Sequence, residues 1–111
     1  MDDAPIIKQG IYFDLDTNAL KQYYPKPSWN HAYDDIKSFL KSNGFEWEQG
    51  SGYHSKEPML FPEAFEIIEN MADKYPWLNK CVNACNVSDV PVTTNVTFIF
   101  DKTADIPERE D

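Results

Sequence analysis

Arginine is nearly absent from this 111-residue sequence, and positive charge as a whole is scarce. Ten Lys and Arg residues, of which Arg109 is the only arginine, stand against nineteen Asp and Glu residues, so the formal net charge is −9. A chain this acidic repels polyanions at long range, which excludes binding of duplex DNA through a broad basic face. Contact with a nucleic acid must therefore be local, or bridged by a metal ion.

Long apolar runs and cysteines are also scarce. No segment approaches the roughly 18 residues of a membrane-spanning helix, and the first residues lack the basic and apolar regions of a signal peptide. The two cysteines, Cys81 and Cys85, are four residues apart, a spacing that does not suit a disulfide if their segment is helical. We predict a cytoplasmic protein that makes no membrane contact and whose cysteines act as small buried hydrophobic residues.

The residues that are present suffice for one domain with a hydrophobic core, since 41% are hydrophobic and 14% aromatic. Apolar residues at steps of three and four predict helices over residues 29–43 and 61–75, and a short third helix over 77–82. Ser28 has the character of a helix N-cap, and the proline-containing segment 17–28 is typical of a loop. Alternation and turn residues predict strands at these places: 8–15, 45–48, 53–55, 84–90 and 96–100.

The order strand, helix, strand, strand, helix, strand is typical of the ferredoxin-like βαββαβ plan, an α+β fold with both helices on one face of an antiparallel sheet. The short helix and the C-terminal strand are additions to it. We predict an N-terminal extension (1–10), one domain (11–100) and a disordered acidic tail (101–111). The uncovered sheet face favours a homodimer, in which the last strand pairs with the sheet edge of the partner.

Asp14 and Asp16 form the pair with the clearest chemical potential, at the end of the first predicted strand. Two carboxylates two residues apart point the same way if the strand persists, and their oxygens suit a divalent cation such as Mg²⁺. Such an ion activates a bound water and offsets charge that develops on a phosphate. Alternatively, Asp16 caps the following turn and Asp14 only ends a strand. The spacing leaves both interpretations open.

Eight segments, the first of which contains Asp14 and Asp16, follow one another in an order and spacing that resemble a known family. They are YFDLDTNAL (12–20), YYP (23–25), AYDDI (32–36), NGF (43–45), QGSGY (49–53), SK (55–56), PWL (76–78) and CV (81–82). Together they span about seven-tenths of the chain and resemble the virulence-associated protein D (VapD) family. The N-terminal extension, the segment after Pro91 and the acidic balance depart from that family's pattern.

The resemblance implies a ferredoxin-like dimer related to the CRISPR-associated type-2 spacer-acquisition nucleases. It also implies an endoribonuclease that cleaves single-stranded RNA and that, in some members, is a toxin paired with a small antitoxin protein. The family's catalytic Asp at the end of the first strand corresponds to Asp14, and the polar hairpin positions correspond to Ser51 and Tyr53.

On this interpretation Asp14 of each protomer lies near the twofold axis, where it binds Mg²⁺ together with Asp16 or acts as a base on water or a ribose 2′-hydroxyl. Ser51 assists catalysis. Substrate contacts fall to Gly50, to Lys56 beside a phosphate and to Tyr53 stacked on a base. His54, next to the hairpin, suits either a general acid or a structural role.

A different class of function fits the same composition. A small acidic dimer can mimic a nucleic acid, or occupy the basic groove of a host or phage defence enzyme, without catalysing any reaction. In that case the excess of carboxylates is the functional feature.

Overall fold

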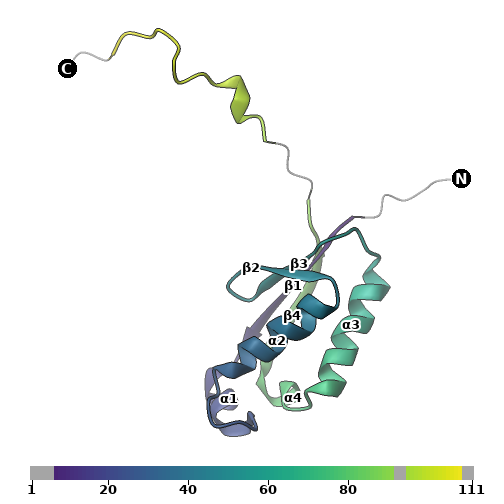
Figure 1. Cartoon of the computed structure of the whole chain (residues 1–111). Coiled ribbons are helices and arrows are strands. Elements are labelled where there is room, and N and C mark those ends of the chain that lie inside the picture. Colours follow the sequence, from purple (N-terminus) through teal and green to yellow (C-terminus); the bar gives the residue numbers. More distant parts are fainter. Residues whose placement is uncertain (1–6, 92–94, 109–111) are drawn as a thin grey trace, which may run out of the picture.

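The computed structural model describes residues 7–91 and 95–108. Four strands in that part of the chain form one antiparallel sheet in the order β2-β3-β1-β4 (Figure 1). The elements are β1 Gln9–Leu15, α1 Thr17–Tyr23, α2 His31–Ser42, β2 Phe45–Gln49, β3 Gly52–Ser55, α3 Phe61–Lys74, α4 Leu78–Cys81 and β4 Val82–Asp89. The series β1-α2-β2-β3-α3-β4 follows the ferredoxin-like plan, so the predicted α+β class is confirmed.

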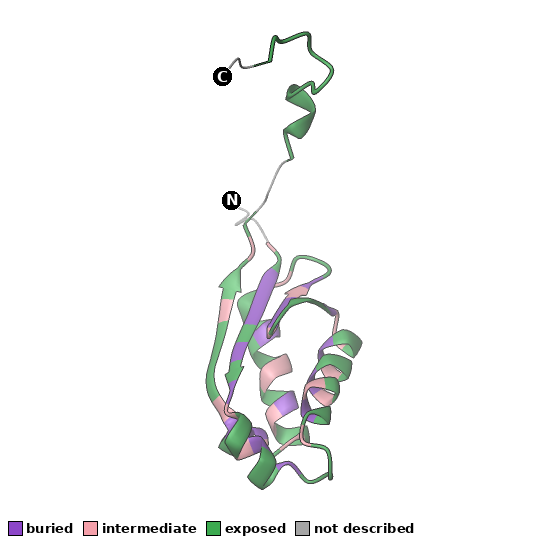
Figure 2. Ribbon diagram, turned by 90° about the vertical axis from the view of Figure 1, so that its left-hand side faces the viewer, coloured by how far each residue is buried: buried purple, intermediate pink, exposed green. Residues whose placement is uncertain are grey.

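Strand β1 lies inside the sheet and separates its two faces. Ile11, Phe13 and Leu15 are buried on the side of the helices, whereas Tyr12 and Asp14 are exposed on the opposite side. Helices α2 and α3 both lie on the first side (Figure 2). No helix of the described chain covers the second, which we call the open face.

The segment expected to be a loop begins with helix α1. Asp16 is its N-cap, because the Asp16 side chain accepts hydrogen bonds from the backbone N–H groups of Asn18 and Ala19. Leu20, which is fully buried, fixes the helix to the core, and the chain turns extended at Tyr24 before Pro25. Pro25 and Pro27 follow the end of this helix at Tyr23, so they do not interrupt it.

Helix α2 begins later than the N-cap expected at Ser28. Its N-cap is Asn30, and the Ser28 hydroxyl donates to the Asn30 side chain at 2.7 Å instead of capping the helix. The predicted helix α3 is confirmed within one residue, with Pro62 in its first turn.

The prediction of a strand over residues 96–100 is wrong. Within the described tail, Thr97–Ile99 form a single 3-10 turn, and Phe98 and Phe100 are 83% and 76% exposed. An alternating segment becomes a strand only where another strand pairs with it, and this segment extends away from the domain (Figure 1). Residues 1–6 of the expected extension and 109–111 of the expected tail lie outside the described residues. No described helix is long and apolar enough to cross a lipid bilayer.

Candidate active site

The strand register brings an aromatic ring and an imidazole together on the open face. In the pairing of β1 with β3, Tyr12 stands opposite Gly52, and Gly10 stands opposite His54. The Tyr12 ring lies flat over both glycines: a Cβ on Gly10 would be 2.6 Å from the Tyr12 hydroxyl oxygen, and one on Gly52 would be 3.1 Å from a ring carbon. Neither glycine has a positive φ, so both are needed for space and not for backbone conformation. They allow the Tyr12 hydroxyl to reach His54.

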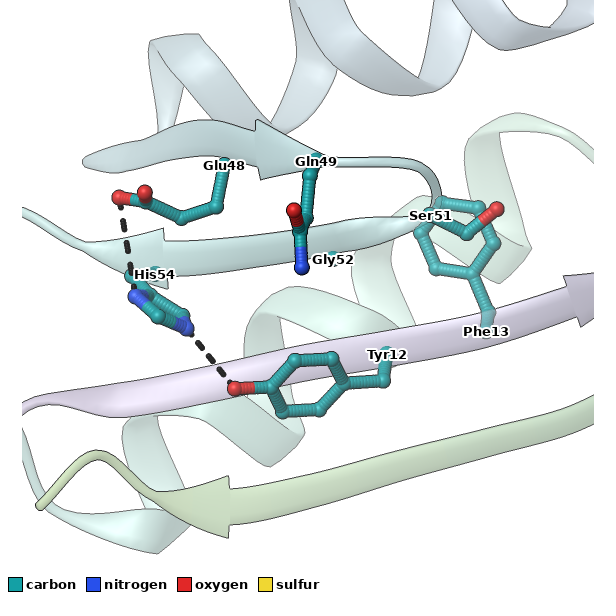
Figure 3. Close-up of a pocket in the computed structure, with 7 residues that line it drawn as sticks. All are labelled: Tyr12, Phe13, Glu48, Gln49, Ser51, Gly52 and His54. Atoms are coloured by element: carbon teal, nitrogen blue, oxygen red, sulfur yellow. Dashed lines mark hydrogen bonds and ion pairs between the residues drawn. The ribbon is translucent and has the colours of Figure 1, made fainter. Parts of the chain in front are cut away.

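A cavity of about 530 Å³ lies over this part of the sheet, and its lining residues come from β1 and the β2–β3 hairpin (Figure 3). They are Tyr12, Phe13, Glu48, Gln49, Ser51, Gly52 and His54. The Tyr12 hydroxyl oxygen lies 2.8 Å from Nε2 of His54, and Nδ1 of His54 lies 3.6 Å from a carboxylate oxygen of Glu48. Three ionisable groups therefore form a series along one wall of an open cavity.

The direction of proton donation from Tyr12 to His54 follows from the position of Glu48 at the other end of the series. The Glu48 carboxylate, 3.6 Å from Nδ1, is at ion-pair distance, and its negative charge favours a proton on that nitrogen, so we assign the proton of a neutral His54 ring to Nδ1. Nε2 is then free to accept the hydrogen bond of the Tyr12 hydroxyl. When the ring gains a second proton, the Glu48 carboxylate becomes its ion-pair partner. The arrangement can take up a proton at the Tyr12 oxygen and hold the resulting charge on the imidazole.

Asp14 lies on the same face, two residues beyond Tyr12 and so about 7 Å further along β1. Its side chain is exposed, and it stands opposite Ala84 of β4, a small residue that leaves the carboxylate uncovered. Ser51 is on the hairpin turn, where its carbonyl accepts from the Phe13 N–H at 3.3 Å. Gly50, with φ of +55°, makes this turn possible. The structure thus places Asp14 beyond Tyr12 on the open face and Ser51 in the cavity wall.

Comparison with known proteins decides the family. No protein-family model matches the chain. It is 49% identical over 89 residues to the endoribonuclease VapD of Dichelobacter nodosus, covering 80% of this chain and 92% of that protein. It is 42% identical over 74 residues to the endoribonuclease VapD of Helicobacter pylori, covering 65% and 76%. The endoribonuclease VapD 2 of Riemerella anatipestifer is 33% identical over 72 residues, covering 65% and 77%.

The chain belongs to the VapD family. The resemblance seen in the sequence is thereby confirmed, and the residues that it singled out can be compared with their places in this VapD chain.

The carboxylate of Asp16 does not face the same way as that of Asp14. Its Oδ1 accepts hydrogen bonds from Asn18 and Ala19 at 2.9 and 3.1 Å, which is the capping role left open by the sequence. No group of three or more His, Cys, Asp or Glu side chains in the described residues is arranged to hold a metal ion. One exposed carboxylate and one capping carboxylate do not make a Mg²⁺ site within a single chain.

Tyr53 and Lys56 do not join this site. Tyr53 is only 4% exposed and stacks on Phe13 on the helix side of the sheet, so no ring face is free for an RNA base. Burial and, to a smaller extent, the negative charge of Asp34 raise the pKa of Tyr53, which keeps its phenol protonated. Extending the β1–β3 register puts Lys56 opposite residue 8, six positions or about 20 Å from the level of Asp14. The lysine lies instead near Trp47.

The motifs did not point to Tyr12 and Glu48 as functional residues. Tyr12 shares the two-residue alternation of Asp14, which would have indicated a common face. Glu48 gave no such signal, because the β2–β3 register shifts between Trp47 and Gln49.

Proposed function

We propose that this protein is an endoribonuclease that cleaves unpaired RNA on the open face of its sheet. The observation that carries the proposal is the 2.8 Å contact between the Tyr12 hydroxyl and Nε2 of His54 in the wall of the open cavity. Three relatives, 33–49% identical to this chain, bear the name endoribonuclease, which supports the same reaction class.

The reaction that suits these groups uses the ribose 2′-hydroxyl as the nucleophile. The 2′-hydroxyl gives its proton to the Tyr12 oxygen while Tyr12 passes its own proton to Nε2 of His54. The 2′-oxygen forms a bond to the adjacent phosphorus, the bond from phosphorus to the 5′-oxygen breaks, and the 5′-oxygen takes a proton from water. The hydroxide so formed takes the extra proton from His54, which restores the starting state of the relay. The products are a 2′,3′-cyclic phosphate and a 5′-hydroxyl. Glu48 stabilises the imidazolium, and Ser51 and Gln49 offer hydrogen bonds to the phosphate.

Asp14 remains a catalytic candidate in this proposal, as an additional base. A homodimer that closed over the open face would bring a second Asp14 toward the first and enclose the cavity between two copies. In that arrangement a Mg²⁺ ion would need its further oxygen ligands from the second copy, from water or from the substrate phosphate.

A role as a cytoplasmic toxin held by a small antitoxin protein belongs to the same proposal. An open cavity is a surface that such a partner can cover. The acidic-mimic function is the alternative, in which this face binds a protein and cleaves nothing.

The test incubates the purified protein with a short unpaired RNA labelled at its 5′ end, once with Mg²⁺ and once with EDTA. We expect cleavage by the wild type to leave 2′,3′-cyclic phosphates. His54→Ala should lower kcat by about a hundredfold or more, because it removes the final proton acceptor. His31→Ala is the matched control, since His31 is the other histidine of the chain and is exposed in the first turn of α2.

Equal rates for His54→Ala and the wild type would overturn the relay. A loss confined to Asp14→Asn would move catalysis to that carboxylate. A folded wild type that cleaves no RNA in either buffer would favour the binding alternative.

A further inference from the structure

Three hollows follow one another around the β2–β3 hairpin. The first is the cavity of the candidate active site. The second shares Phe13 and Ser51 with the first and is also lined by Gly50, Trp47 and Lys37. The third shares Lys37 and Trp47 with the second and continues along the outer strand β2. Consecutive hollows share lining residues, and together they form one path that leads from the open face around the hairpin turn to the helix side of the edge strand β2, where Trp47 stands opposite Tyr53.

Trp47 stands at the middle of this path as an exposed aromatic platform. Its side chain is 49% exposed although the ring is fixed, because its indole N–H donates to the Gly50 carbonyl at 2.7 Å. The ammonium of Lys37 lies 4.9 Å from the ring centroid. A fixed ring loses little conformational freedom when another flat group stacks on it, and every RNA base has such a flat face.

The far end of the path is basic in a chain that is otherwise acidic. Lys37, Lys41 and Lys56 line the third hollow against one carboxylate, that of Glu46, which leaves a local excess of two positive charges. The whole chain carries −9. Asp34 lines the second hollow, where its negative charge repels a phosphate. Its carboxylate can instead accept hydrogen bonds from the N–H groups of a base. The charges along the path therefore differ from one hollow to the next. Phosphates are favoured at the lysines, and a base is favoured at Trp47.

We propose that this path is a binding track for the strand of unpaired RNA that flanks the cleaved bond. One base stacks on Trp47, and the neighbouring phosphates pair with Lys37, Lys41 and Lys56. The track rests on the proposed function, because it leads into the candidate active site. It selects single strands, since a base inside a duplex has no free face for Trp47.

The experiment measures binding and cleavage separately. Binding is followed by the fluorescence anisotropy of an unpaired oligonucleotide in which hydrogen replaces the ribose 2′-hydroxyls, so that the proposed reaction cannot occur. Trp47→Ala should weaken binding about tenfold, and Trp47→Phe should restore most of it because phenylalanine retains a stacking face. Phe65→Ala is the matched control, an aromatic side chain of α3 that is 50% exposed.

The lysines are tested against a control variant of equal net charge. The triple variant Lys37→Gln, Lys41→Gln and Lys56→Gln should reduce the slope of log affinity against log salt by about two, because three phosphate contacts are lost. The control triple of Lys74→Gln, Lys80→Gln and Lys102→Gln changes the net charge equally and should leave that slope unchanged. For RNA cleavage, the track variants should raise KM and leave kcat close to the wild-type value.

The outcomes separate the track from the nuclease. Track variants that bind like their controls, while the wild type binds and cleaves, would overturn the track and leave the proposed function standing. A wild type that binds through Trp47 and the three lysines but never cleaves RNA would support the track and overturn the nuclease. A wild type that binds no unpaired strand would overturn both. Thermal unfolding of each variant confirms that it is folded.

Discussion

Substituting Gly10 with alanine should slow RNA cleavage without removing any chemical group from the site. The added Cβ would lie 2.6 Å from the Tyr12 hydroxyl oxygen and 2.8 and 2.9 Å from two ring carbons. Ordinary van der Waals contact begins at 3.4 Å, so the hydroxyl must retreat by about 0.8 Å. Such a shift takes a 2.8 Å hydrogen bond to about the limit of its useful length unless His54 follows. The backbone tolerates alanine because Gly10 has no positive φ.

The expected loss in kcat is at least tenfold, similar to that of Tyr12→Phe, because both changes break the path from the Tyr12 oxygen to Nε2 of His54. The assay is a double-mutant cycle on the cleavage of an unpaired RNA. Gly10→Ala combined with Tyr12→Phe should be no slower than Tyr12→Phe alone, since there is only one contact to lose.

The control is Ser88→Ala, which changes the residue opposite Gly10 on β4. A folded Gly10→Ala protein with the wild-type kcat would show that the contact between Tyr12 and His54 does not contribute to cleavage. Additive losses in the double variant would show that Gly10 acts on something other than Tyr12.

Three further outcomes are expected. Glu48→Gln should lower kcat about threefold, the equivalent of one partly exposed ion pair, because the imidazolium loses its ion-pair partner; an unchanged rate would remove Glu48 from the relay. Asp16→Ala should reduce the free energy of unfolding by about 1 kcal/mol through loss of the α1 cap, with cleavage retained; a stable variant without cleavage would return Asp16 to the active site. Burial and the 2.6 Å hydrogen bond to Asp35 raise the pKa of Tyr24 from 10.0 to about 12, so the folded state holds this proton more tightly than the unfolded state. The stability from protonated Tyr24 is complete below pH 10 and is lost as the pH rises through about 12. Tyr24→Phe should lower the free energy of unfolding at neutral pH by about 1 kcal/mol and reduce its decline at alkaline pH. If denaturant titrations show the same alkaline decline for Tyr24→Phe and the wild type, Tyr24 is not its cause.

The sequence predicted what depends on local pattern. The stripes of α2 and α3 and the alternation of β1 come from side chains a few residues apart, so the chain itself contains the information. The exposed position of Asp14 follows from the same alternation. The cap at Asp16 was one of two open interpretations, and only the geometry of α1 decided between them.

The rest depends on pairings between distant segments. Whether residues 96–100 form a strand is decided by the presence of a partner strand, which alternation does not reveal. The position of Glu48 beside His54 follows a register shift in the hairpin, and the position of the Tyr12 ring follows the space above two glycines. Lys56 was expected beside a substrate phosphate, and the antiparallel register places it far from the level of Asp14.

If RNA is bound at the cavity on the open face, His54 must sense the bound strand. The chain has only two histidines, so the imidazole C–H signals in an NMR spectrum are few and can be assigned with one variant each. The measurement titrates a non-cleavable unpaired oligonucleotide into the wild-type protein and follows both rings. The signals of His54 should shift in a saturable manner while those of His31 stay in place. Shifts confined to His31, or binding that leaves His54 unaffected, would place the RNA away from this cavity.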